Sequence, residues 1–192
     1  MNMDRRDRLR DAAIEVLATV GGRGLTHRAV DAVASVPLGT TKNYFPTRDA
    51  LLRASAERCV ERYRATAAEL AAAGPPPADR AGLAALLGGL LRDVAGPGRQ
   101  RMAAFAELRA EAGRRPWLAE LLDPVSAADV PTHEHLLRAA GLPADPGRVR
   151  ALTLALHGAL WHLLTGAPET LRAAGLTDPD AFARDLLDTI CP

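Results

Sequence analysis

Cysteine, lysine and aromatic residues are scarce in this sequence. The 2 cysteines, Cys59 and Cys191, are too few and too far apart to indicate a disulfide framework or a metal cluster. Aromatic residues make up only 4% of the 192 residues, and Lys42 is the only lysine among 24 basic residues. This preference for arginine suggests a bacterial source with a GC-rich genome.

Long apolar runs and catalytic motifs are also missing. No stretch approaches the roughly 20 apolar residues that span a membrane, and no charged leader with an apolar run opens the chain. We therefore expect a cytoplasmic protein with no membrane partner. None of the serines lies in a nucleophile-elbow motif, and no glycine-rich phosphate loop follows a strand. These absences argue against an enzyme, and we expect no catalytic residue, no cofactor and no bound metal.

One short segment, His133-Glu134-His135, carries side chains that can bind metals. Its two histidines are two residues apart, which places them on different sides of a helix. We therefore interpret the segment as a solvent-facing stretch after an N-cap at Thr132.

The remaining composition is that of an ordinary globular protein, with 48% apolar and 24% charged residues. The net charge of +1 hides an asymmetry. Residues 1–64 carry 12 basic and 8 acidic side chains, whereas the rest of the chain carries 12 basic and 15 acidic ones. Such an excess is expected of a part that meets phosphate, although chance also produces an excess of this size.

Every long segment has the apolar spacing of a helix, which predicts an all-α fold. A first helix ends at Gly21-Gly22, and a long helix begins after Thr47 and ends at the proline cluster of residues 75–77. We expect breaks at Pro124 and Pro131, which should kink or interrupt whatever helix spans residues 116–140. The further helices are expected at 79–95, 99–113, 116–123, 132–140, 146–165 and 178–190.

Residues 26–48 are the most informative part of the sequence. Thr26 can cap a short helix, and Pro37 suits the first position of a next helix that runs from about Leu38 to Tyr44. The side chains of this next helix are mostly small or polar, so packing alone does not explain them. Two helices around a tight turn, the second of them polar, are typical of a helix-turn-helix whose second helix enters the major groove of DNA.

The order of these features resembles the tetracycline-repressor (TetR) family of bacterial transcriptional regulators. The resemblance implies an all-α fold with an N-terminal three-helix helix-turn-helix DNA-binding domain, residues 1–46. It also implies a C-terminal helical-bundle domain for ligand binding and dimerisation, residues 47–192. The similarity covers about residues 8–53 and rests on Arg8-Leu9-x-x-Ala12-Ala13, Gly22-x-Gly24-Leu25-Thr26-x-Arg28-x-Val30, Ala34-x-Val36, Gly39-Thr40, Tyr44-Phe45 and Arg48-x-x-Leu51-Leu52.

The resemblance also implies DNA contacts at matched positions. Phosphate contacts are implied at Thr40, Tyr44 and Arg48, and a base or phosphate contact at Arg28. The variable positions that read bases are Leu38, Gly39, Lys42 and Asn43.

Three positions in or next to the predicted second helix of this motif depart from the family pattern. Pro37 replaces a capping serine, Thr41 replaces an apolar core residue and Lys42 replaces a tyrosine. Lys42 can donate to guanine or to phosphate, and Asn43 suits the edge of adenine. The fold should survive these changes, but the operator sequence cannot be inferred from a relative. The arginines at positions 5, 6, 8 and 10 either contact DNA or lie on a solvated helix face.

The C-terminal helices offer an apolar interior with few polar groups, which is the character of a small-molecule site. We select the rare aromatic, methionine and polar side chains there as candidate ligand contacts, and ordinary core packing is the alternative for each. For Arg109 a solvent-facing position is favoured, because an unpaired buried charge is costly. The candidates are Tyr63, Met102, Phe105, Arg109, Trp117, His157 and Trp161.

One short recognition helix covers few base pairs, so we expect a homodimer that binds a palindromic double-stranded DNA operator. In the family the last two long helices of each subunit form a four-helix bundle, which here implies residues 146–165 and 178–190. The candidate interface residues are Ala151, Ala155, Gly158, Ala159, His162, Leu186, Leu187 and Ile190.

The favoured function is that of a repressor released from its operator by an unknown small-molecule effector, which tilts the helix that begins after Thr47. The effector works only if it binds more tightly to the conformation that does not fit DNA. Two alternatives stay open. One is a regulator of the same family without a small-molecule effector, and the other is an all-helical enzyme or carrier.

Overall fold

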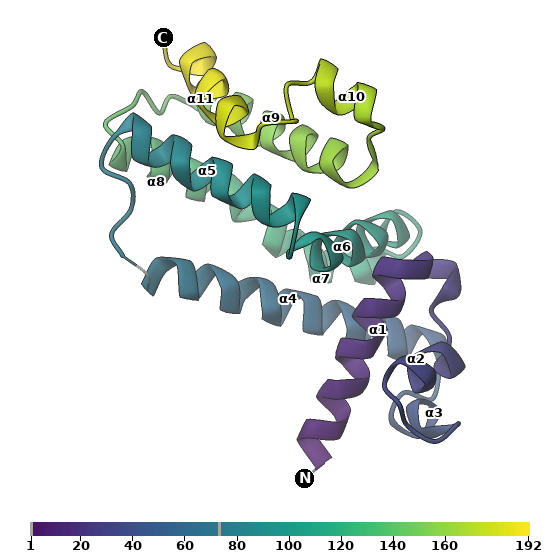
Figure 1. Ribbon diagram of the computed structural model, residues 1–192. Helices are drawn as coiled ribbons and strands as arrows, with labels where there is room; N and C mark the ends of the chain where they lie inside the picture. Colours follow the sequence, from purple (N-terminus) through teal and green to yellow (C-terminus); the bar gives the residue numbers. More distant parts are fainter. Residues whose placement is uncertain (1, 73) are drawn as a thin grey trace. The chain divides into compact units, whose positions relative to one another are not determined.

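The computed structural model describes residues 2–72 and 74–192, and the regular secondary structure of these residues is entirely α-helical (Figure 1). The predicted all-α fold class is confirmed. The chain divides into two compact units. The first comprises Met1–Ala68 and Gln100–Val125, and the second comprises Glu69–Arg99 and Ser126–Pro192. Within the described parts of the chain, no helix is long and apolar enough to cross a membrane.

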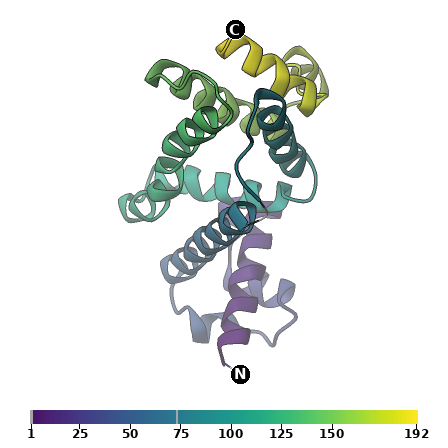
Figure 2. The ribbon, with the colours of Figure 1, turned by 90° about the vertical axis from the view of Figure 1, so that its left-hand side faces the viewer.

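The first unit is built from α1 (Asn2–Gly24), α2 (His27–Val33), α3 (Thr40–Tyr44), most of α4 (Arg48–Ala72), α6 (Arg99–Ala112) and most of α7 (Pro116–Ala127). Figure 1 shows α1 crossing the first part of α4, and Figure 2 shows the two helices after a turn of 90°. One continuous apolar core joins all six helices, because side chains from α6 and α7 pack with those of the first four. Its large buried members include Leu9, Leu17, Leu25, Phe45, Leu51, Leu52, Leu108, Leu118 and Leu122.

The head formed by α1, α2 and α3 therefore shares a core with later helices. The division into a DNA-binding part, residues 1–46, and a ligand-binding part, residues 47–192, concerns function and stays a prediction.

Ionic contacts reinforce the crossing of α1 and α4. Arg10 is 8% exposed, and its guanidinium donates to the Ala54 carbonyl at 3.2 Å and to Glu61 at 2.6 Å. Arg58 on α4 donates to Asp11 on α1 at 2.7 Å. Of the N-terminal arginines, Arg10 is thus neither a DNA contact nor a solvated side chain, since it binds α4.

Glycine ends the regular part of α1 as predicted. Gly21 has φ 72° and ψ −179°, a conformation that is almost confined to glycine. The next residue, Gly22, donates its N–H to the carboxylate of Glu107 on α6 at 2.9 Å. The kink at Gly21 thus directs the end of α1 toward α6.

The second and third helices differ in how far they match expectation. Thr26 caps α2, because its hydroxyl accepts the N–H of Ala29 at 3.1 Å. The predicted start of the third helix is too early, since α3 begins at Thr40 and not near Leu38. Gly39 has φ 88°, which a right-handed helix cannot contain, so Pro37 belongs to the turn.

The second unit consists of α5 (Arg80–Ala95), α8 (Asp129–Ala139), α9 (Pro146–Thr165), α10 (Pro168–Ala173) and α11 (Pro179–Ile190). Its core is lined by leucines of α5, α8, α9 and α11, among them Leu83, Leu87, Leu137, Leu152 and Leu187. Aspartates cap three of the helices at residues 79, 145 and 178. The three aspartates stabilise the first turns of these helices, because the N–H groups there have no acceptor within the helix.

The breaks predicted at Pro124 and Pro131 are wrong, and the stretch between the predicted helices 146–165 and 178–190 contains a further helix. α7 continues past Pro124, and Pro131 lies in the first turn of α8, where a missing N–H costs little. Thr132 is not an N-cap, because its hydroxyl donates back to the Ala128 carbonyl at 2.7 Å. α10 was not predicted.

Candidate nucleic-acid interface

The third helix and the turn before it expose several of the predicted DNA-contact residues. Leu38 is 73% exposed, Lys42 and Asn43 are exposed, and Thr40 is half-buried. Thr41, in contrast, is fully buried. Of the side chains of α3, only that of Thr41 is thus fully buried, while those of Lys42 and Asn43 remain exposed.

The carboxylate of Asp31, on α2, holds the beginning of α3. One oxygen, Oδ2, accepts the N–H of Gly39 at 2.7 Å. The other, Oδ1, accepts the N–H of Thr41 at 2.7 Å and its hydroxyl at 2.5 Å. We call these three hydrogen bonds the Asp31 clamp.

The clamp keeps a buried carboxylate ionised. Burial by itself would raise the pKa of Asp31, but the hydrogen bonds from Thr41 and Gly39 and the nearby His27 lower that pKa on balance. Asp31 is 1% exposed, so its charge is stabilised by the protein and not by water.

A second contact with α2 holds the other end of α3. The Nε2 atom of His27 lies 2.6 Å from the carbonyl oxygen of Phe45, the residue that ends α3. A carbonyl only accepts, so this Nε2 carries the proton. Both ends of the short α3 are therefore attached to α2 by polar side chains.

The remaining predicted DNA contacts differ in exposure and in the contacts that they make within the protein. Arg28 is exposed on α2, and Tyr44 is half-buried, with its ring 6.4 Å from that of Phe45. Arg48 donates to the carbonyls of Leu25 and Gly22, so its guanidinium already ties the start of α4 to the end of α1. This structural use of Arg48 could not be deduced from the sequence, because its partners are main-chain atoms more than 20 residues away.

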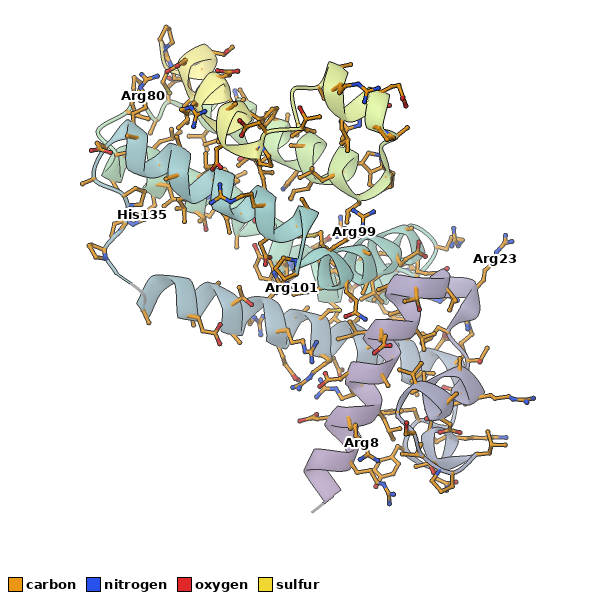
Figure 3. The ribbon with its side chains drawn as sticks, viewed as in Figure 1. Arg8, Arg23, Arg80, Arg99, Arg101 and His135 are labelled. Atoms are coloured by element: carbon orange, nitrogen blue, oxygen red, sulfur yellow. The ribbon has the colours of Figure 1, made fainter. Side chains whose placement is uncertain are left out.

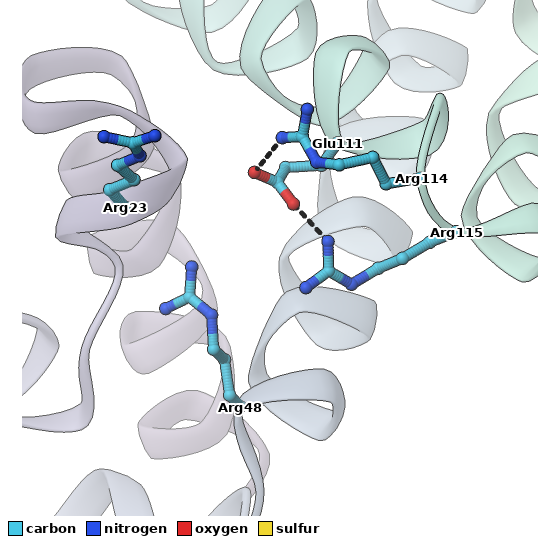
Figure 4. A pocket seen from close by; sticks show the side chains of 5 residues that line it. All are labelled: Arg23, Arg48, Glu111, Arg114 and Arg115. Carbon is cyan, nitrogen blue, oxygen red and sulfur yellow. Dashed lines mark hydrogen bonds and ion pairs between the residues drawn. The ribbon is translucent and has the colours of Figure 1, made fainter.

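A basic hollow lies beside that contact. It has a volume of about 610 Å³ and is lined by Arg23, Arg48, Glu111, Arg114 and Arg115. Glu111 binds Arg114 at 2.8 Å and also binds Arg115 (Figure 4). Arg23 extends away from the end of α1 (Figure 3). Burial would raise the pKa of Glu111, but the two arginines lower it on balance.

The predicted ligand contacts fall into two groups. Tyr63, Phe105 and Trp117 pack half-buried against the core of the first unit, and Met102 is half-buried on α6. Arg109 is exposed and donates to Asp123 at 2.7 Å, as the solvent-facing alternative expects. The guanidinium of Arg53 lies 4.5 Å from the centre of the Trp117 ring.

The other two ligand candidates belong to the second unit. His157 is exposed on α9, with its Nε2 atom 2.8 Å from Asp129, and Trp161 is 58% exposed. Neither has the surroundings of an enclosed site within its own unit, and both lie on the outward face of α9.

That outward face also carries part of the predicted dimer interface. Ala151 and Gly158 are exposed, and Ala155 and His162 are half-buried. Leu186 and Ile190 are half-buried on α11, whereas Ala159 and Leu187 are buried within the protomer. Sequence reasoning missed Leu154, which is 68% exposed on the same face as Ala151, Gly158 and Trp161. The helical spacing of these four positions was the available signal.

The histidines of the second unit correct one interpretation. His133 is not solvent-facing, because its Nδ1 atom lies 2.8 Å from the hydroxyl of buried Thr153, and burial lowers its pKa. His135 is exposed (Figure 3). Among the residues that the structure describes, no group of three or more metal-binding side chains could hold a metal ion.

Comparisons with known proteins agree with this architecture. Residues 78–191 match the family described as Tetracyclin repressor-like, C-terminal domain. A curated HTH-type transcriptional regulator in the dhlA 5' region of Xanthobacter autotrophicus, itself uncharacterised, is 38% identical over 92 residues. That match covers 48% of this chain and 44% of the relative, so it spans less than half of either protein.

Solved structures match over nearly the whole chain. The multidrug binding protein EbrR, complexed with imidazole, is 36% identical with a TM-score of 0.61, covering 98% of this chain and 95% of that chain. A TetR-family member from Streptomyces coelicolor A3 is 33% identical with a TM-score of 0.64, covering 98% of each chain. This chain is therefore a member of the TetR family of DNA-binding transcriptional regulators.

Proposed function

We propose that the protein is a homodimeric repressor of the bacterial cytoplasm that binds a palindromic operator through α3. The observation that carries the proposal is the arrangement of α3. Its side chains Lys42 and Asn43 are exposed, while both of its ends are attached to α2. A polar helix held in this way suits the major groove, where a good bidentate base contact is worth about 1–3 kcal/mol.

Selection of duplexes from a random-sequence pool tests this proposal. We expect wild-type protein to enrich a palindromic duplex and to bind it less tightly as salt rises. The double variant Thr40→Ala/Lys42→Ala should bind the enriched duplex at least about tenfold more weakly, because it loses a phosphate and a base contact. The matched control is Thr170→Ala/Arg172→Ala, which removes an exposed threonine and an exposed basic residue from α10. Equal binding by both double variants would contradict the assignment.

We further propose that an aromatic cation releases the protein from DNA. EbrR has been crystallised with ethidium, proflavin and malachite green, and it is 32–34% identical to this chain in those structures. The aromatic residues Tyr63, Phe105 and Trp117 supply ring faces in the first unit, and such faces attract cations. The Arg48 contacts with the end of α1 provide a route by which a movement of α4 would reach the head.

Ethidium is a suitable probe for this second proposal. Because the dye also intercalates into DNA, its affinity is measured by calorimetry on the protein alone. We expect binding that Phe105→Ala weakens about tenfold and that Phe182→Ala, on α11, leaves unchanged. When ethidium is added to the complex with DNA, wild-type protein should dissociate at a lower dye concentration than Phe105→Ala. Equal dissociation would be the effect of intercalation alone and would contradict the proposal.

One observation favours a regulator without a small-molecule effector. Two of the candidate ligand groups already have protein partners, because Arg53 lies over the Trp117 ring and Arg109 binds Asp123. Under this second candidate the protein binds its operator as before, and calorimetry detects no ethidium binding.

A further inference from the structure

The recognition helix α3 has little of its own to stabilise it. It is five residues long, begins after a glycine in the left-handed conformation and buries only Thr41. Isolated helices of this length are not stable in water, because nucleation costs more than one turn of hydrogen bonds returns. The orientation of its outward side chains must therefore come from contacts with the rest of the head.

The Asp31 clamp supplies an orientation that an apolar contact would not. An apolar side chain at position 41 would bury area, but it would tolerate small rotations of α3 about its own axis. The clamp instead directs three donors at two fixed oxygen atoms, at 2.5 to 2.7 Å. Hydrogen bonds of this kind depend on angle as well as distance, so they define how the helix is turned.

The buried polar side-chain atoms of the Asp31 clamp also all have hydrogen-bond partners. Asp31 and Thr41 are 1% and 0% exposed, and no buried side-chain nitrogen or oxygen atom of the described residues lacks a partner. A buried polar pair with all its bonds made favours one geometry, because any displacement leaves a buried group unpaired.

We propose that Asp31 is the positioning residue of the recognition helix, and that its hydrogen bonds to Gly39 and Thr41 set the sequence discrimination of the protein. Asp31 itself lies out of reach of DNA, and it acts through the placement of Thr40, Lys42 and Asn43. The inference rests on the proposed insertion of α3 into the major groove. Its consequence is that weakening the clamp should reduce discrimination between duplexes more than it reduces affinity for DNA in general.

The test measures the affinity for two duplexes at one salt concentration, the duplex that wild-type protein enriches and a random one of equal length. Asp31→Asn and Thr41→Val each remove part of the clamp with almost no change of shape. We expect each to bind the enriched duplex roughly tenfold more weakly, the value of one good base contact, and to bind the random duplex within about twofold of wild type. Thr41→Ser keeps the hydroxyl, so it should retain most of the discrimination that Thr41→Val loses.

A matched control separates positioning from stability. Thr153 is 4% exposed, and its hydroxyl is hydrogen bonded in the second unit, so Thr153→Val makes the same chemical change away from α3. It should lower the melting temperature as Thr41→Val does, but it should leave the ratio of the two affinities at the wild-type value. A variant that merely unfolds loses affinity for both duplexes equally, which would overturn the inference.

Two further outcomes are distinguishable. If wild-type protein enriches no sequence, the proposed function fails and the inference fails with it. If wild-type protein discriminates and both Asp31→Asn and Thr41→Val keep the wild-type ratio, the proposed function stands and the inference alone is overturned.

Discussion

Among single residues, Asp31 couples the stability of the head to pH. Its pKa in the folded protein is lowered, so the ionised carboxylate stabilises the fold at every pH above its pKa in the unfolded chain. That stabilisation is lost as the pH falls through the lowered pKa of the folded state. Glu61 and Glu111 also have lowered pKa values and add to the same acid sensitivity, so the part due to Asp31 must be taken by difference.

Asp31→Asn provides that difference. We expect it to lower the free energy of unfolding by about 1–3 kcal/mol at neutral pH, because a buried acceptor and its charge are lost. The gap from wild type should stay constant at every pH well above the ordinary aspartate pKa of 3.8, and it should narrow as the pH falls below that value and Asp31 becomes protonated. Urea denaturation followed by circular dichroism measures this difference in the free energy of unfolding at each pH. The control Asp185→Asn changes an exposed aspartate, and it should stay within experimental error of wild type. A gap that does not depend on pH would show that the charge of Asp31 is irrelevant.

At the scale of elements, the two glycines Gly21 and Gly89 should respond in opposite ways to the same substitution. Gly21 has φ 72°, and a Cβ there would lie 3.1 Å from an oxygen of Glu107. Gly21→Ala should therefore destabilise the protein by about 1–3 kcal/mol. Gly89 lies inside α5, where a Cβ would make only an ordinary contact with Arg92. Gly89→Ala should stabilise the protein by up to about 1 kcal/mol, the gain in helix propensity. Thermal melts should show a lower melting temperature for Gly21→Ala and a higher one for Gly89→Ala. Equal shifts of the melting temperature would contradict the claim that the backbone at Gly21 requires glycine.

The helices and their contacts also show which features could be predicted from the sequence and which could not. Helix positions followed from apolar spacing and from caps such as Thr26, which are local signals. The partner of Thr41 did not follow, although Thr41 stood out at a core position, because Asp31 is ten residues away on another helix. The link from Gly22 to Glu107 spans 85 residues and leaves no local pattern. A polar helix with exposed side chains could thus be predicted here, whereas the hydrogen bonds that orient it could not.

At the scale of the whole molecule, the exposed face of α9 should decide the oligomeric state. Leu154 and Trp161 are 68% and 58% exposed, and Ala151 and Gly158 on the same face permit close approach of a second helix. Large apolar side chains that are exposed together with small residues mark an interaction surface. A second copy of this chain is the occupant that the proposed palindromic operator would require, because each copy would then present one α3 to one half-site.

The double variant Leu154→Arg/Trp161→Arg should therefore sediment as a monomer where wild type sediments as a dimer. Its affinity for the enriched duplex should fall roughly a hundredfold or more, because the second α3 is no longer held at the other half-site. Val20→Arg/Leu90→Arg is the matched control, since these apolar residues are 60% and 38% exposed on α1 and α5, and neither lies on α9. A control that also dissociates would mean that added charge, and not the α9 face, controls assembly. A monomeric variant with full affinity would mean that one α3 reads the operator alone, which would contradict the proposed mode of binding.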